Sequence, residues 1–205
     1  RSPLKMPSLL IGTHNLGKQT EILAILDGLG IKWVTPEDLG LVLEIPELGP
    51  DYATHARTKA IAYALAYNHW TLSDDSGLEV AALGGVPGLG SARLGGEGKA
   101  DADRRRVLLE MLRPHPRPWK ARFHATVALS SPAGEVELAE GFCPGEVIPT
   151  ERGSGGFGYD PIFLLESVGL TMAELNMDQK NRLSHRARAI QALMPALKST
   201  FLLQG

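Results

Sequence analysis

Residues 9–34 read LLIGTHNLGKQTEILAILDGLGIKWV, and this stretch predicts a strand, a tight loop, a helix and a second strand. Apolar residues from Ile22 to Leu29 recur at helical spacing after a short apolar run and a polar loop. Gly28 and Gly30 then supply stop signals for the helix ahead of the second apolar run. The opening of the chain therefore predicts a β-α-β unit, which is typical of an α/β protein.

The rest of the chain continues this mixture of helices and strands. Two glycine-rich segments predict loops: 84–98 has too many glycines for regular structure, and 153–165 is a loop that runs into an apolar stretch. The last predicted helix contains Pro195, where a bend or break is expected. The predicted helices cover 53–67, 101–112 and 183–203, and the predicted strands cover 70–75, 78–83 and an antiparallel pair, 121–131 and 135–142.

Composition narrows the classes of function. The 205 residues are 43% hydrophobic, enough for a sizeable core in a single domain. A net charge of −2 argues against a polymeric nucleic acid as partner, because a phosphate backbone demands a basic face. The single cysteine, Cys143, excludes an internal disulfide and suits a reducing cytoplasm. No apolar run approaches the roughly 18 residues of a membrane helix, and the apolar patch near the N-terminus is too short for a signal peptide.

Residues 73–80, SDDSGLEV, place two carboxylates side by side after an apolar run. A turn or a helix cap is one interpretation, because Asp, Ser and Gly are common in turns. A magnesium site is the other, with Glu47, Asp74 and Asp75 as candidate oxygen ligands. Successive strand residues face opposite sides, so only one aspartate is expected to point at a ligand. We favour Asp75, next to an expected bend at Gly77, with Asp74 in support.

Residues 12–19, GTHNLGKQ, come close to the phosphate-binding P-loop pattern. Gln19 stands where that pattern has the hydroxyl that holds magnesium, so a metal must be held elsewhere. A helix N-terminus still favours anions, Lys18 adds a full charge, and Thr13 and Asn15 add short polar groups. Both a phosphate cradle and an ordinary strand-to-helix turn fit these residues.

Two later segments carry aromatic and basic side chains. In GGFGYDP, residues 155–161, Phe157 fits a stacking partner for a flat ring, although an inward-packed Phe and Tyr fit equally. In KNRLSHRARA, residues 180–189, the cations are either a solvated helix face or hydrogen-bond donors for a ligand. Ser184 is a candidate N-cap for the C-terminal helix.

Six ordered motifs between residue 9 and about residue 190 resemble the inosine triphosphate pyrophosphatases. The motifs are THNLGK, E-x11-K from Glu47 to Lys59, SDDSGLEV, PGLGSARLGGEG, GFGYDPIF and MAELNMDQKNRLSHRA. The resemblance implies an elongated α/β fold, with a mixed sheet flanked by helices and a cleft between two lobes of one domain, residues 1–205. It also implies a Mg²⁺-dependent homodimer that hydrolyses ITP, dITP and XTP, purine nucleoside triphosphates, to the monophosphate and pyrophosphate.

The resemblance assigns roles to individual residues. Asp75 is the expected catalytic base and, with Glu47, the expected metal ligand. Two departures stand out: His14 replaces a usual glycine, and Thr54-His55-Ala56 replaces a Glu-Asn-Ala stretch, so the roles of that Glu and Asn do not transfer. The expected substrate-binding residues are Thr13, His14, Asn15, Leu16, Gly17, Lys18, Lys59, Ser76, Phe157, Gly158, Tyr159, Asp160, Lys180, His185 and Arg186.

Three other functions fit the residues less well. A P-loop GTPase or kinase lacks its hydroxyl at Gln19. A regulator that binds nucleotides without turnover does not explain why Asp75 and Glu47 are both present. A dinucleotide-binding oxidoreductase needs G-x-G-x-x-G at the start of a helix, which GLGSARLGG, residues 88–96, does not supply.

Overall fold

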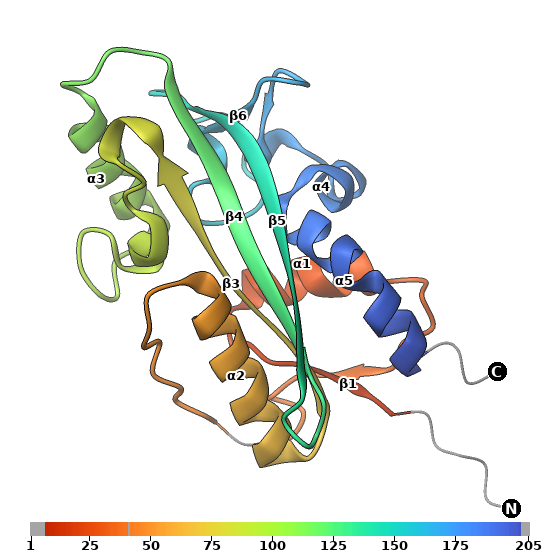
Figure 1. Cartoon of the computed structure of the whole chain (residues 1–205). Helices are drawn as coiled ribbons and strands as arrows, with labels where there is room; N and C mark the ends of the chain where they lie inside the picture. Colours follow the sequence, from red (N-terminus) through yellow and green to blue (C-terminus); the bar gives the residue numbers. More distant parts are fainter. Residues whose placement is uncertain (1–6, 41, 202–205) are drawn as a thin grey trace, which may run out of the picture. The chain divides into compact units, whose positions relative to one another are not determined.

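The computed structural model describes residues 7–40 and 42–201 (Figure 1). The chain divides into two compact units. Unit 1 comprises 1–75, 125–141 and 186–205, and unit 2 comprises 76–124 and 142–185. Residues 1–6, at the N-terminus, and residues 202–205, which include the end of the predicted last helix, lie outside the described residues.

A seven-stranded sheet has the order β2-β1-β3-β4-β5-β6-β7, flanked by helices, which confirms the predicted mixed α/β class. β1 pairs in parallel with β2 and β3, whereas β6 pairs antiparallel with β5 and β7. The strands are β1 (Leu9–Ile11), β2 (Trp33–Val34), β3 (Trp70–Val80), β4 (Trp119–Ser130), β5 (Val136–Val147), β6 (Phe163–Leu165) and β7 (Leu170–Thr171). The α-helices are α1 (Leu16–Leu26), α2 (Tyr52–Tyr67), α3 (Asp101–Leu112), α4 (Met177–Leu183) and α5 (His185–Phe201).

The opening β-α-β unit is confirmed as β1, α1 and β2. Gly12, directly after β1, donates its N–H to the carbonyl of Leu72 on β3 at 2.8 Å. A Cβ at Gly12 would lie 2.3 Å from Oγ of Ser73, so only glycine lets the chain leave the strand here. The phosphate-loop candidate therefore starts against β3, the strand that carries the paired aspartates.

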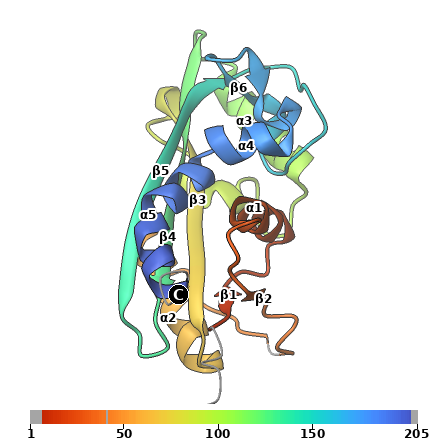
Figure 2. The same cartoon turned by 90° about the vertical axis from the view of Figure 1, so that its right-hand side faces the viewer.

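Unit 1 packs helices on both faces of its part of the sheet (Figures 1 and 2). On β4, Ala125, Val127 and Leu129 belong to a buried cluster with residues of α1 and α5. Ala128, which points the other way, packs with Ala56 and Ala60 of α2. The two-residue alternation of strand side chains thus gives each face its own helices.

Unit 2 has a separate core. Leu78 and Val80 of β3 cluster with Leu108 and Leu112 of α3 and with apolar residues of β5 and β6. The rings of Phe123 and Phe163 lie 4.4 Å apart between centroids. Among the described residues, no helix is both long and apolar enough to cross a bilayer.

Several predicted boundaries were wrong. The strands expected at 70–75 and 78–83 form one strand, β3, which continues through Gly77 next to β4, a hydrogen-bonded neighbour of twelve residues. Residues 81–83 form a 3₁₀ turn instead. The loop expected at 84–98 contains a 3₁₀ helix, Gly88–Arg93, which is held because Ser91 Oγ accepts from Leu78 N and donates to the carbonyl of Gly88.

The remaining predicted elements differ from the structure in detail. α5 begins at His185, directly after Ser184, and continues as a helix through Pro195, so the chain is not broken there. α4 was not predicted, although its capping box, in which Asn176 and Gln179 bond each other's backbone N–H, is a readable start signal. β4 and β5 are joined by five residues, too short for a parallel crossover, so they form the expected antiparallel pair.

Candidate active site

The loop before α1 is a capped helix start. The side chain of Asn15 accepts from Lys18 N at 3.0 Å, and Thr13 Oγ1 accepts from Asn15 N at 3.1 Å. No acidic residue lies in the first turn of α1, so the partial positive charge of the helix end is not neutralised locally. Leu16, the first residue of the helix, is 71% exposed. This arrangement leaves the N-terminus of α1 suited to an anion.

Glu37, which sequence analysis missed, braces this loop. Gln19 Nε2 donates to the carbonyl of Thr13 at 2.6 Å and to Glu37 Oε2 at 3.0 Å, and His14 Nδ1 lies 2.8 Å from Glu37 Oε1. Burial alone would raise the pKa of Glu37, but hydrogen bonds from His14 and Gln19 lower it to about 2. Gln19, the residue that breaks the P-loop pattern, therefore has a structural role here, and His14 is held by a carboxylate.

The paired aspartates contact different cations. Asp74 is fully buried and lies 3.0 Å from Arg186 Nε and 3.3 Å from Lys18 Nζ. Asp75 lies 2.8 Å from His55 Nδ1 and 3.9 Å from Lys59 Nζ. Because β3 is extended through both residues, their side chains leave on opposite faces, as predicted.

The environments of the two carboxyl groups shift their pKa values in opposite directions. Burial alone would raise the pKa of Asp74, but the charges of Lys18 and Arg186 hold it well below its ordinary value. Burial raises the pKa of Asp75, and the charges of Lys59 and Lys18 only partly oppose it. Asp75 is therefore the stronger base of the pair, and its role as the catalytic base stays a prediction.

The two expected metal ligands lie around one ammonium group. Lys59 Nζ is 3.4 Å from Glu47 Oε1 and 3.9 Å from Asp75 Oδ1. The part of the chain that the structure describes contains no group of three or more His, Cys, Asp or Glu residues placed to hold a metal ion. Magnesium typically takes one or two carboxylates and completes its shell with water and substrate phosphate. Glu47 and Asp75 supply two such carboxylates, so this donor set fits the ion. Oδ1 of Asp74, on the opposite face of β3, is buried without a hydrogen-bond partner among the described residues.

His55 is a functional candidate that sequence analysis left without a role. Its side chain is buried, with Nδ1 against Asp75 Oδ2 and Nε2 3.2 Å from the carbonyl oxygen of Gly49. Both partners, the carboxylate and the carbonyl, are acceptors, and a neutral imidazole donates to one of them. His55 and Lys59 are four residues apart on α2 and share one helix face, a signal that was readable from the sequence.

In unit 2, Asp160 and Lys180 form a buried pair at 2.8 Å. Asp160 Oδ2 also accepts from Phe157 N at 3.1 Å, and Lys180 Nζ lies 5.6 Å from the centroid of the Phe157 ring. At Gly156, with φ +70°, a Cβ would lie 2.0 Å from Asp160 Oδ2, so the pair requires glycine there. Tyr159 packs inward and donates to the carbonyl of Ser91 at 2.6 Å, whereas Phe157 stays half-buried.

The basic segment 180–189 is not uniformly solvated. Lys180 and Arg186 are buried, whereas Arg182 and Arg188 are exposed, so the prediction of a solvated face holds only for the second pair. Lys180 belongs to unit 2 and Arg186 to unit 1, where Arg186 is 1% exposed and donates to Asp74 and Glu21.

The remaining predicted substrate-binding residues occupy element ends and loops. The ring of His185 stacks on Phe123, with centroids 4.7 Å apart. Gly17 lies in the first turn of α1, Ser76 follows Asp75 on β3, and Gly158 lies in the loop before Asp160. Substrate contact by each of these residues remains a prediction.

The chain is similar to known proteins over nearly its whole length. A model of the Ham1 family matches residues 9–196. The protein is 40% identical over 195 residues to the dITP/XTP pyrophosphatase of Bacillus subtilis (strain 168), covering 95% of this chain and 98% of the relative. It is 39% identical to the dITP/XTP pyrophosphatase of Desulforamulus reducens, over 96% of this chain and 98% of that one. The structure of a HAM1 protein from Coxiella burnetii matches with a TM-score of 0.84 and 34% identity, covering 95% of this chain and all of the other.

Proposed function

The chain belongs to the Ham1 family, and on that premise we propose that it hydrolyses deaminated purine nucleoside triphosphates to the monophosphate and pyrophosphate. This membership confirms the resemblance to the inosine triphosphate pyrophosphatases. The observation that carries the proposal is near-full-length identity of about 40% to proteins named dITP/XTP pyrophosphatase. The expected substrates are ITP, dITP and XTP.

The residues around Asp75 suit hydrolysis between the α- and β-phosphates. A nucleoside triphosphate brings as many as four negative charges, and Lys18, Lys59 and the N-terminus of α1 offset them. Asp75 accepts the proton of the attacking water, and its raised pKa makes it a better base than an ordinary aspartate. His55 holds the Oδ2 atom of Asp75 in place.

Magnesium is the proposed cofactor. Glu47 and Asp75 would hold the ion together with substrate oxygens, and Lys59 lies between the two carboxylates. When bound, the ion supplies charge stabilisation to the pyrophosphate that departs. Both residues are carboxylates, and carboxylate oxygens are the hard ligands that suit magnesium, which supports the proposal.

The base is the proposed ligand of the loop that holds Asp160 and Lys180. A lysine ammonium only donates hydrogen bonds, so Lys180 suits the 6-oxo group of hypoxanthine or xanthine and opposes the amino group of adenine. Phe157 offers a stacking surface worth about 1–3 kcal/mol per base. Asp160 accepts from Lys180 and fixes its direction.

The oligomeric state and the location of the protein are further proposals. We propose a homodimer, which rests on the family resemblance alone, and a cytoplasmic location, supported by one buried cysteine. The balanced charge of the chain, −2 in total, supports a small nucleotide rather than a polymer as the partner.

The proposed reaction is tested by its products. With Mg²⁺ present, the protein is incubated separately with ITP, XTP, GTP and ATP, and pyrophosphate is resolved from orthophosphate. We expect pyrophosphate from ITP and XTP, and far slower turnover of ATP and GTP. Orthophosphate as the first product would favour a GTPase-like reaction, and tight ITP binding without product would favour a regulator.

His55→Ala is expected to lower kcat for ITP by about 10- to 100-fold, because small misplacements of a catalytic group carry penalties of that order. KM should change much less, since the contacts of His55 are with Asp75 and Gly49. His55→Asn should recover part of kcat, because an amide can still donate to Asp75. His69→Ala, on the same unit, is the control. Equal kcat values for the His55→Ala variant and the parent would show that His55 has no role in turnover.

A further inference from the structure

Two side chains of α3 hold one residue of the proposed base-binding loop. Gly158 N donates to Asp101 Oδ2 at 2.8 Å, and Arg105 Nη1 donates to the carbonyl of Gly158 at 2.8 Å. Both backbone polar groups of Gly158 are therefore bonded to a single helix. Asp101 and Arg105 are four residues apart, so they project from the same face of α3.

Arg105 is itself fixed in place. Its Nε donates to Glu151 Oε1 at 2.7 Å, and its side chain is only 12% exposed. The guanidinium thus spans a carboxylate and a carbonyl with its rigid fork of donors. Gly158 has φ +61°, a left-handed conformation that favours glycine, and the bonds to α3 hold it there.

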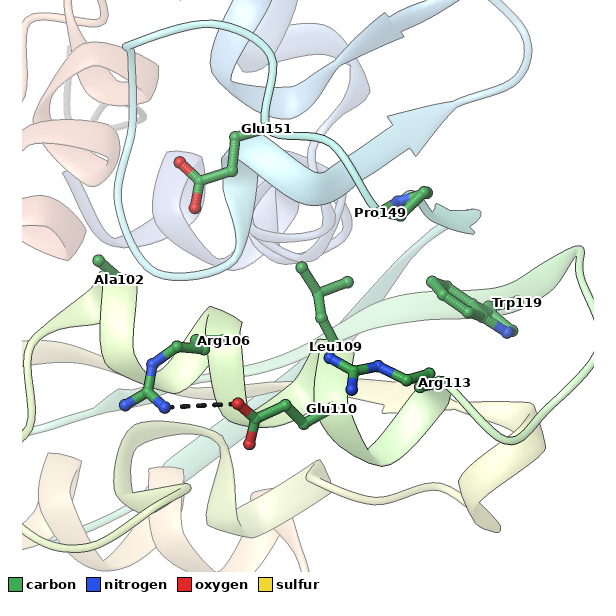
Figure 3. A pocket seen from close by; sticks show the side chains of 8 residues that line it. All are labelled: Ala102, Arg106, Leu109, Glu110, Arg113, Trp119, Pro149 and Glu151. Atoms are coloured by element: carbon green, nitrogen blue, oxygen red, sulfur yellow. Dashed lines mark hydrogen bonds and ion pairs between the residues drawn. The ribbon is translucent and has the colours of Figure 1, made fainter.

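Glu151, the carboxylate bonded to Arg105, also borders a pocket. The pocket of about 530 Å³ lies between α3 and the segment that carries Pro149 and Glu151 (Figure 3). The ion pair between Arg105 and Glu151 is therefore one link between this segment and the helix, beside open volume. Figure 3 also shows that the neighbouring Arg106 bonds to Glu110 on its own helix.

We infer that Asp101 and Arg105 are positioning residues that determine purine selectivity in this chain. The inference rests on the proposed function and deepens it. Gly158 lies directly after Phe157 and two residues before Asp160, which directs Lys180. Fixing Gly158 therefore fixes the proposed stacking ring relative to the proposed donor. Both residues contact only the main chain of the loop at this point, so they act through its shape.

This role predicts where the effect of mutation falls. A base-binding loop that is ordered before substrate arrives costs less entropy on binding. Loss of the bonds from Asp101 and Arg105 to Gly158 should weaken binding of the base and leave the rate of the chemical step nearly unchanged. When the loop is less ordered, Lys180 can move away from the amino group of adenine more easily. The preference for ITP over ATP should therefore fall.

The test compares Arg105→Ala with Arg106→Ala, a 64% exposed arginine one position along the same helix. Steady-state kinetics with ITP and ATP give kcat and KM, and calorimetry with inosine monophosphate, without Mg²⁺, gives binding of the base. For Arg105→Ala we expect KM for ITP and Kd for inosine monophosphate to rise about tenfold, as for the loss of one charged hydrogen bond. The kcat for ITP should stay within about twofold, and the ratio of ITP to ATP efficiency should fall. Arg106→Ala should match the parent.

Arg105→Lys should recover part of the loss, because an ammonium reaches one of the two acceptors but not both in the same fork. A lower melting temperature for Arg105→Ala with unchanged KM and Kd would show a purely structural role and overturn the inference. A parent protein that fails to bind inosine monophosphate would overturn it as well. A parent that binds inosine monophosphate but releases no pyrophosphate from ITP would reject the proposed function, while the calorimetry still decides the role of Arg105.

Discussion

Asp75→Asn is expected to reduce turnover of ITP by about 10²- to 10⁴-fold, the usual contribution of a general base. Asparagine keeps the shape of the side chain but accepts no proton and brings no negative charge to a metal. The chain should still fold, because burial already disfavours the charged form of Asp75 and a neutral amide removes that conflict. Measured quantities are kcat by pyrophosphate release and the melting temperature.

The control for this variant is Asp103→Asn, an aspartate on α3 whose side chain is 47% exposed and whose described ion pair is with Arg106. It should leave kcat unchanged. Calorimetry with inosine monophosphate adds a second check, since the Asp75→Asn variant should bind this product about as well as the parent. A kcat within a few-fold of the parent would take the role of base away from Asp75 and direct attention to Glu47.

The sequence predicted well those features that depend on neighbours along the chain. The spacing of apolar residues located α1, and the two-residue period of a strand placed Asp74 and Asp75 on opposite faces. Lys18 and Asn15 were assigned to a helix start, and the structure gives Asn15 the N-cap of α1. Local patterns carry this information because helix starts and strand alternation are properties of short segments.

Partners brought together by folding were not predictable in the same way. His55 is twenty residues from Asp75, and Glu37 meets His14 and Gln19 through the loop after β2. The same holds for Arg105 and Gly158, which are 53 residues apart. Single residues of common types give no signal of such pairing, because the contact depends on how helices pack on strands.

The strand break expected at Gly77 was wrong, because a local preference was overridden by pairing between strands. Glycine weakens a strand locally, and a bend was a reasonable expectation from a short window. The pairing of β3 with a neighbouring strand of twelve residues overrides that preference. Long-range pairing decided this boundary, so local propensity misplaced it.

Arg186→Met is expected to destabilise the folded chain by about 3–5 kcal/mol, the usual result of removing one partner from a buried ion pair. Arg186 is 1% exposed and donates to both Asp74 and Glu21, two buried carboxylates that would lose this cation. Urea unfolding measures the loss, and Arg188→Met, at an exposed position two residues along α5, is the control. Equal unfolding midpoints for the two variants would contradict the expectation.

The pH dependence of this loss follows from Asp74. The pKa of Asp74 is lowered in the folded chain because the charges of Lys18 and Arg186 outweigh burial, so its stabilisation is present above the ordinary value of 3.8 and is lost as the pH falls below it. Without Arg186 the folded-state pKa rises, and the variant should recover stability relative to the parent as the pH falls through the acid range. Glu21→Gln added to Arg186→Met should also recover part of the loss, since it removes one of the two stranded charges. A constant stability difference between the parent and Arg186→Met from pH 7 to pH 3 would mean that packing, and not the charge of Asp74, accounts for the effect of Arg186.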